Sequence, residues 1–162
     1  VMGRVFMTPI DDPFAVVLRE IEAVRHKTRV IVVDFHAEAT SEKVAMGWHL
    51  DGKVTLVVGT HTHVQTADER ILPNGTAYLT DAGMTGPHDS IIGMEREPSL
   101  ARFLTGTPTK FEPATGNPRL NGVIVTADDK TGRATAIKRI SYSDADLTAL
   151  TKTTEPVHAH QR

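Results

Sequence analysis

The chain has 162 residues, no cysteine and a formal net charge of −2, and its lysines and arginines are scattered along the sequence. The scattered charge argues against an extended nucleic-acid or anionic-membrane surface, and the absence of cysteine excludes a disulfide scaffold. The length suits one domain, and no apolar run approaches the roughly 18 residues of a membrane-spanning helix. We therefore expect a cytoplasmic protein with no membrane contact.

The first half of the chain predicts helices that alternate with buried strands. Residues 1–7 are typical of a strand, and Asp11-Asp12-Pro13 predicts a helix start with a carboxylate N-cap and proline in the first turn. Runs of β-branched residues at 29–36 and 54–59 indicate two strands. Because a helix separates these strands, we expect them to be parallel neighbours joined by a right-handed crossover.

The helix between these two strands has recognisable ends. Thr40 or Ser41 can cap its start, and Gly52 is placed to stop it. Its buried face is expected to comprise Val44, Ala45 and Trp48.

The second half of the chain predicts shorter elements. An Asn-Gly turn indicates a hairpin over 70–79, and a short helix is expected at 97–104, ending near Gly106. Two further strands, at 120–126 and 135–142, are expected to pair antiparallel. The expected fold class is therefore α/β.

Two histidines, His61 and His63, come directly after the second buried strand and its terminal Gly59. In an extended chain residues i and i+2 project to the same side. His36 ends the other buried strand. Because the carboxyl ends of parallel strands meet at one edge of a sheet, the three imidazoles form a candidate metal cluster. The alternative is an ordinary pair of polar loop histidines.

Two carboxylates flank His36 in the sequence. Asp34 and Glu38 are candidates for orienting a metal-bound histidine from behind, because such histidines commonly donate their second ring proton to a carboxylate. The alternative for Glu38 is a role in the turn into the following helix.

Other polar residues carry weaker signals. A second His-x-His pair, His158 and His160, lies in a polar tail with no strand to hold it, so we expect no site there. Asp81 and His88 lie in a glycine-rich segment and are expected to be solvated loop residues.

Two segments resemble the YmdB-like family of calcineurin-type metallophosphoesterases. They are V-D-F-H-A-E-A-T-S-E-K at 33–43 and G-T-H-T-H-V-Q-T-A-D-E-R at 59–70, and the segments at 80–87 and 103–106 match as well. The resemblance covers about residues 1–140. It implies a four-layer α/β/β/α sandwich that holds two divalent metal ions, with Mn or Fe favoured and Zn or Mg as alternatives. It also implies phosphodiesterase activity, including on 2′,3′-cyclic nucleotides.

The same resemblance implies roles for the histidines. His36 and His61 would bind one metal ion and His63 the other, and a metal-bridging hydroxide would attack phosphorus. The family places an acidic bridging ligand and an Asn-His pair, whose histidine is the general acid, upstream of the equivalent of Val1, so no catalytic residue is assigned within this chain. We therefore expect residues 1–150 to be the C-terminal portion of a metallophosphoesterase domain truncated at its N-terminus, residues 151–162 to be a polar tail, and the isolated chain to be nearly inert.

The expected substrate is a small phosphodiester or cyclic nucleotide, with RNA ends as a further possibility. Homo-oligomerisation is expected because a truncated sandwich leaves a sheet edge open to pairing. Two alternative functions stay open from the sequence. One is a metal hydrolase of similar architecture, of the capsule-polyglutamate type, and the other is a non-catalytic binding or assembly module.

Overall fold

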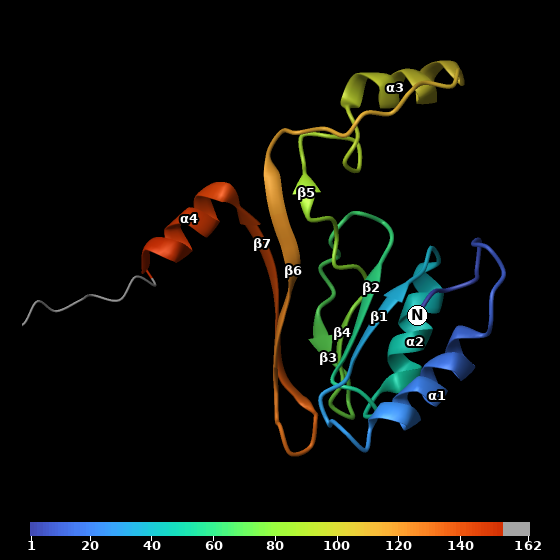
Figure 1. Ribbon diagram of the computed structural model, residues 1–162, viewed down its shortest axis with the longest axis vertical. Helices are drawn as coiled ribbons and strands as arrows, with labels where there is room; N and C mark the ends of the chain where they lie inside the picture. The colour runs from blue at the N-terminus through green and yellow to red at the C-terminus, as the bar shows by residue number, and fades with distance from the viewer. Residues whose placement is uncertain (154–162) are drawn as a thin grey trace, which may run out of the picture. The chain divides into compact units, whose positions relative to one another are not determined.

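A computed structural model describes residues 1–153 of the chain (Figure 1). The chain divides into two compact units. The first unit comprises Val1–Met84 and Asn121–Ile140, and it carries the candidate metal residues. The second unit comprises Thr85–Leu120 and the described residues from Ser141 onward.

The first unit is built on a four-stranded sheet with the strand order β1-β2-β4-β3. β1 pairs with β2 in parallel, β2 pairs with β4 in parallel, and β3 is antiparallel to β4. The parallel pair and the Asn-Gly hairpin predicted from the sequence are therefore confirmed. The strands span Val32–His36 (β1), Leu56–Thr60 (β2), Arg70–Ile71 (β3) and Ala77–Leu79 (β4).

Two helices precede β1 and β2. α1 (Pro13–Val24) begins as predicted, with Asp12 accepting a hydrogen bond from the backbone N–H of Phe14. α2 (Thr40–Leu50) has Ala39 as its N-cap with no side-chain hydrogen bond, so the predicted cap at Thr40 or Ser41 is wrong. The helix already includes both residues, which places their hydroxyls inside its first turn. Gly52 follows the C-cap with φ of 80°, as expected of a helix stop.

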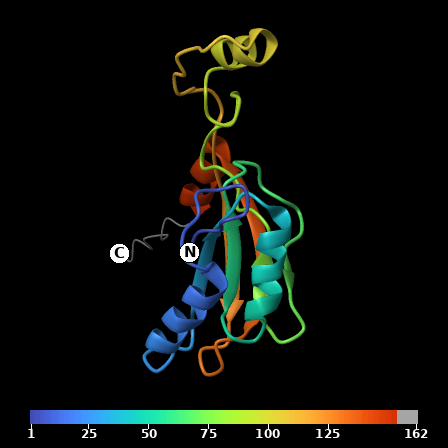
Figure 2. The ribbon, with the colours of Figure 1, turned by 90° about the vertical axis from the view of Figure 1, so that its right-hand side faces the viewer.

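The sheet of the first unit is covered on both faces (Figure 1), and Figure 2 views this unit from the side of the helices. α1 and α2 pack on one face, and the hairpin of β6 (Pro118–Ala127) and β7 (Ala134–Ser143) packs on the other. This layering confirms the expected α/β class. The helix-side core includes Val17, Ile21, Phe35, Met46, Leu50, Val57 and Tyr78, and the hairpin-side core includes Leu56, Ala77, Val123, Val125 and Ala134.

The inner face of α2 differs from the prediction. Trp48 is 52% exposed and lies against the guanidinium of Arg70, and Ala45 is also exposed; of the three predicted residues only Val44 packs against the core. Two long charged side chains, Glu42 and Lys43, are buried instead. The spacing of apolar residues therefore predicted the wrong buried face for α2. Glu42 and Lys43 can be buried because both find polar partners inside the first unit.

The opening residues form one bridge in place of the predicted strand. Met2 pairs with His36 in parallel, and the Gly3 N–H donates to the His36 carbonyl at 2.8 Å. The chain then leaves the sheet edge because the backbone N–H groups of Arg4 and Val5 donate to the Glu42 carboxylate.

The second unit holds β5 (Gly86–Pro87), which pairs antiparallel with the start of β6, and the helices α3 (Arg96–Thr105) and α4 (Asp144–Thr153). α3 confirms the predicted short helix and ends at Gly106 with φ of 69°. α4 continues through residues 151–153, and His158 and His160 lie outside the described residues. No helix within residues 1–153 combines the length and apolar character that crossing a membrane requires.

Candidate metal centre

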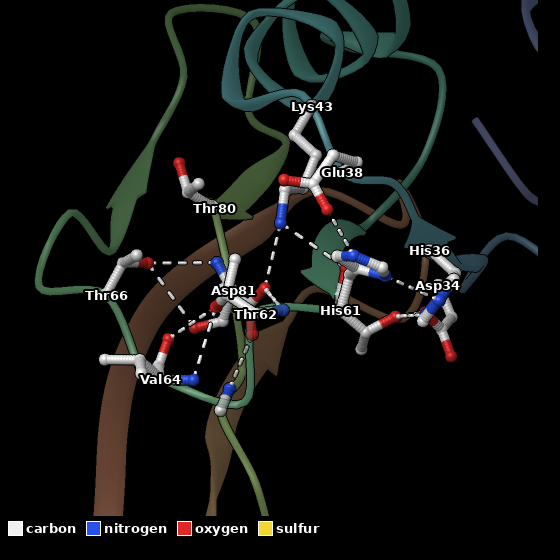
Figure 3. A network of polar contacts seen from close by, with 12 residues as sticks. Asp34, His36, Glu38, Lys43, His61, Thr62, Val64, Thr66, Thr80 and Asp81 are labelled. Atoms are coloured by element: carbon white, nitrogen blue, oxygen red, sulfur yellow. Dashed lines mark hydrogen bonds and ion pairs between the residues drawn. The ribbon is translucent and has the colours of Figure 1, made fainter. Parts of the chain in front are cut away.

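Two of the predicted histidines meet at the carboxyl end of the parallel strands (Figure 3). His36 is the last residue of β1, and the strand register pairs it with Thr60, the last residue of β2. His61 follows immediately, and its Nδ1 lies 3.1 Å from Nε2 of His36. Parallel pairing therefore brings two imidazoles together from positions 25 residues apart.

The ring of His36 is oriented by a chain of two hydrogen bonds. The Thr60 hydroxyl lies 3.0 Å from Oδ1 of Asp34 and 3.1 Å from Nδ1 of His36. Because an ionised carboxylate only accepts, the hydroxyl donates its single proton to Asp34 and accepts from the Nδ1–H of His36. Nε2 of His36 is then the ring nitrogen that carries a lone pair, and it faces His61.

The ring of His61 is oriented from the other side. Its Nε2 donates to Oε2 of Glu38, so Nδ1, the atom facing His36, is unprotonated in the neutral ring. Both carboxylates singled out from the sequence thus act on the histidine pair. Glu38 contacts His61 directly, and Asp34 reaches His36 through Thr60.

This donor set fits a divalent metal ion. The two facing nitrogens lie 3.1 Å apart, and in the neutral tautomers that Thr60 and Glu38 favour, both would present a lone pair to a cation. Imidazole nitrogens about 2.0–2.1 Å from one ion lie roughly 2.8–3.4 Å apart at ligand angles between octahedral and tetrahedral. Carboxylates on the outer ring nitrogens are the usual support of metal-binding histidines.

The third predicted ligand, His63, lies two residues further along the same loop, and its side chain is exposed. Within residues 1–153 no group of three or more His, Cys, Asp or Glu side chains is arranged to hold a metal ion. A role for His63 at a second ion therefore stays a prediction.

The loop that carries His61 and His63 has a strained backbone. The φ angle is 126° at His61 and 64° at His63, in the region that residues other than glycine rarely adopt. Gly59, which lies before this loop, packs closely against the backbone of Thr80. A Cβ at position 59 would lie 1.8 Å from the Thr80 carbonyl oxygen. Such conformations persist only where the surrounding structure enforces them.

A buried ion pair supports this loop. Nζ of Lys43 lies 2.8 Å from Oδ2 of Asp81, and both side chains are 1% exposed. Oδ2 of Asp81 also accepts from the Thr62 N–H at 3.0 Å, and Oδ1 accepts from the Gly83 N–H at 2.9 Å. The expectation that Asp81 is a solvated loop residue is therefore wrong, because protein donors replace water around its carboxylate.

The Asp81 carboxyl is ionised at neutral pH. Burial by itself raises its pKa, but the hydrogen bonds from Lys43, Thr62 and Gly83 outweigh burial and hold the pKa below its ordinary value. The carboxylate therefore carries the charge that compensates the buried ammonium of Lys43.

Sequence reasoning missed Thr60 and Lys43, and it named Asp81 only as a solvated loop residue. The sequence did hold a signal for Asp81, because this residue comes two positions after the strand-type residues that form β4. β4 is parallel to β2, so its carboxyl end lies at the same edge as the histidines. The Asn-Gly turn indicated only the antiparallel pairing with β3, and nothing local indicated the pairing with β2. His88, the other candidate of that segment, lies in the second unit, where its ring contacts the Gly86 carbonyl.

The sequence matches the family model described as YmdB-like protein over residues 1–140. It is 54% identical over 142 residues to the 2′,3′-cyclic-nucleotide 2′-phosphodiesterase of Bacillus subtilis, and the match covers 88% of this chain and 54% of that protein. The chain spans about half the length of the curated relatives it matches.

Two solved structures are similar. A novel phosphatase from Mycoplasma pneumoniae superposes with a TM-score of 0.81 at 38% identity, covering 93% of this chain and 54% of that one. A hypothetical protein from Thermus thermophilus superposes with a TM-score of 0.81 at 48% identity, covering 88% of this chain and 55% of that one.

Proposed function

Because the chain belongs to the YmdB-like family, we propose that its histidine pair serves metal-dependent hydrolysis of a small phosphodiester. A 2′,3′-cyclic nucleotide is the proposed substrate, which is the substrate class named for the Bacillus subtilis relative. RNA ends that carry such a phosphate are a second source of the same chemical group. The observation that carries the proposal is the convergence of two ring nitrogens, His36 Nε2 and His61 Nδ1, which lie 3.1 Å apart at one edge of the sheet.

His36 Nε2 and His61 Nδ1 would hold one divalent ion, and His63 is the proposed ligand of a second. Bound there, a divalent ion would polarise the phosphoryl group and lower the pKa of an attacking water. Mn²⁺ or Fe²⁺ is proposed ahead of Zn²⁺ and Mg²⁺ on the family resemblance, because imidazole donors by themselves suit Fe and Zn alike.

The protein's own residues prepare this centre. Thr60 and Glu38 accept the outer ring protons and so direct the remaining lone pairs toward one point. Asp34 and Glu38 also place negative charge behind the rings, which strengthens them as donors to a cation. No residue of this chain is proposed as the general acid.

We also propose that the chain is the C-terminal part of a longer protein, because its match covers 54% of the Bacillus subtilis relative, and the test is a phosphodiesterase assay on that complete protein. After removal of metal with chelator, hydrolysis of bis-p-nitrophenyl phosphate and of 2′,3′-cyclic AMP should be lost, and Mn²⁺ should restore both. Hydrolysis that survives exhaustive chelation would contradict the proposal. Metal-restored hydrolysis of a polyglutamate peptide without phosphodiester turnover would favour the alternative hydrolase.

Self-association is also part of the proposal. β1 is the outer named strand of its sheet; residues 1–3 bond to its end at Asp34 and His36, and Val32 at its start is 58% exposed. An open strand edge can pair with another chain. Light scattering coupled to gel filtration tests this directly, with a dimer or larger species expected.

A further inference from the structure

We infer that the buried ion pair of Lys43 and Asp81 positions the His61–His63 loop, and thereby sets the metal affinity of the centre. The inference rests on the proposed function. It assigns Lys43 and Asp81 as positioning residues, because they act on the site through the loop backbone.

Asp81 holds the loop at its middle (Figure 3). Its Oδ2 accepts from the N–H of Thr62, the residue between the two histidines, and from Nζ of Lys43. Lys43 Nζ also lies 3.4 Å from the carbonyl of Thr60, at the start of the loop. The pair therefore contacts the backbone on both sides of His61.

The loop needs this restraint because its backbone is strained. With φ of 126° at His61 and 64° at His63, each residue occupies a conformation that is unfavourable for a side chain with a Cβ. Without the Asp81 acceptor the loop could relax toward ordinary φ values. The ring of His61 would then move away from His36, because a change in the backbone φ angle of His61 also changes the direction of its side chain.

The fold also reserves space for the lysine. A Cβ at position 59 would lie 2.6 Å from Cδ of Lys43, so Gly59 lets the lysine stem pass along β2 to reach Asp81. The Asp81 backbone is fixed as well, since its N–H donates to the Thr66 hydroxyl at 2.9 Å. Lys43 thus reaches the loop from α2, and Asp81 reaches it from the segment that follows β4.

Stability alone is a weak reason for this pair. Well-packed apolar residues of similar volume often replace a buried ion pair without loss of stability. What apolar side chains cannot supply is an acceptor for the Thr62 N–H. The geometry is therefore better explained by placement of the loop than by stabilisation of the fold.

The test compares Asp81→Ala and Asp81→Asn in the complete protein. Asp81→Ala removes the acceptor, and we expect the Mn²⁺ dissociation constant from calorimetry to rise about 10–100-fold, as for other groups that orient metal ligands. Asp81→Asn keeps an oxygen for Thr62 and should fall between Asp81→Ala and the parent. In the metal-free protein, amide exchange at Thr62 should accelerate in the same order.

Val17→Ala is the matched control. It opens the core between α1 and the sheet, and should lower the melting temperature while leaving Mn²⁺ affinity within about twofold of the parent. Parent-like Mn²⁺ affinity in folded Asp81→Ala overturns the inference, as does an equal loss of affinity in Val17→Ala. If Asp81→Ala fails to fold, parent-like affinity and Thr62 exchange in Asp81→Asn overturn it. A parent that binds no Mn²⁺ overturns the proposed function instead.

Discussion

His36 and His61 face each other across 3.1 Å, yet the chain holds them in different ways. His36 ends a regular strand, where its backbone N–H and C=O are bonded to Val1 and Gly3. His61 lies in a strained loop whose neighbouring N–H is held by Asp81. One histidine is therefore placed by strand geometry, and the other by side chains that are distant in sequence.

This difference has a consequence for substitutions. Changes at Lys43 or Asp81 should disturb His61 more than His36, because the ion pair contacts the backbone of Thr60 and Thr62 on the two sides of His61. Changes at Thr60 should act first on His36, whose ring its hydroxyl orients.

Removal of either ring should have the largest effect. His61→Ala deletes one of the two facing nitrogens, and we expect phosphodiesterase activity of the complete protein to fall by about 10³-fold, since a bound metal supplies several kcal/mol of transition-state stabilisation. His36→Ala should be equally damaging although its ring is held differently. His26→Ala, at an exposed histidine, is the control. Activity within about tenfold of the parent in either ligand variant would break the proposed pair.

Thr60→Val should have an intermediate effect that is specific to His36. Valine keeps the branched shape but removes the link between Asp34 and Nδ1 of His36. We expect Mn²⁺ affinity to fall about 10–100-fold, measured by calorimetry. Thr135→Val, at an exposed site on β7, provides the same chemical change away from the centre. An unchanged affinity in Thr60→Val would show that strand geometry alone orients His36.

The smallest expected effect concerns Asp68, which ties the segment after the loop to β4. Burial raises the pKa of Asp68, but hydrogen bonds from Thr80 and Thr66 outweigh it and hold the pKa below its ordinary value. Because the folded-state pKa is depressed, this contribution to stability is present above the unfolded-state pKa and is lost as pH falls through the folded value.

Asp68→Asn should therefore lose less unfolding free energy than the parent between about pH 6 and about pH 3, measured by urea titration. Asp129→Asn, in the turn between β6 and β7, is the control and should behave like the parent. Identical pH profiles for Asp68→Asn and the parent would contradict this anchoring role.

The sequence predicted the parts of the site that depend on local patterns. Two runs of β-branched residues separated by a helix indicated parallel strands, and their common edge brought His36 and His61 together. Asp34 and Glu38 could be named because they lie within two residues of His36.

The remaining parts depend on tertiary contacts. Lys43 sits on the inner face of α2, where a hydrophobic pattern predicts apolar residues, because Asp81 neutralises it from 38 positions away. Trp48 is exposed on the same helix. The strained φ values of the loop are likewise enforced by those remote partners, so no local rule indicates them.

Anomalous diffraction from crystals of the complete protein grown with Mn²⁺ would show directly whether His36 and His61 bind the same metal ion. We predict a peak within coordination distance of both His36 Nε2 and His61 Nδ1. A well-occupied Mn²⁺ site elsewhere, with these two nitrogens bound to no ion, would contradict the account.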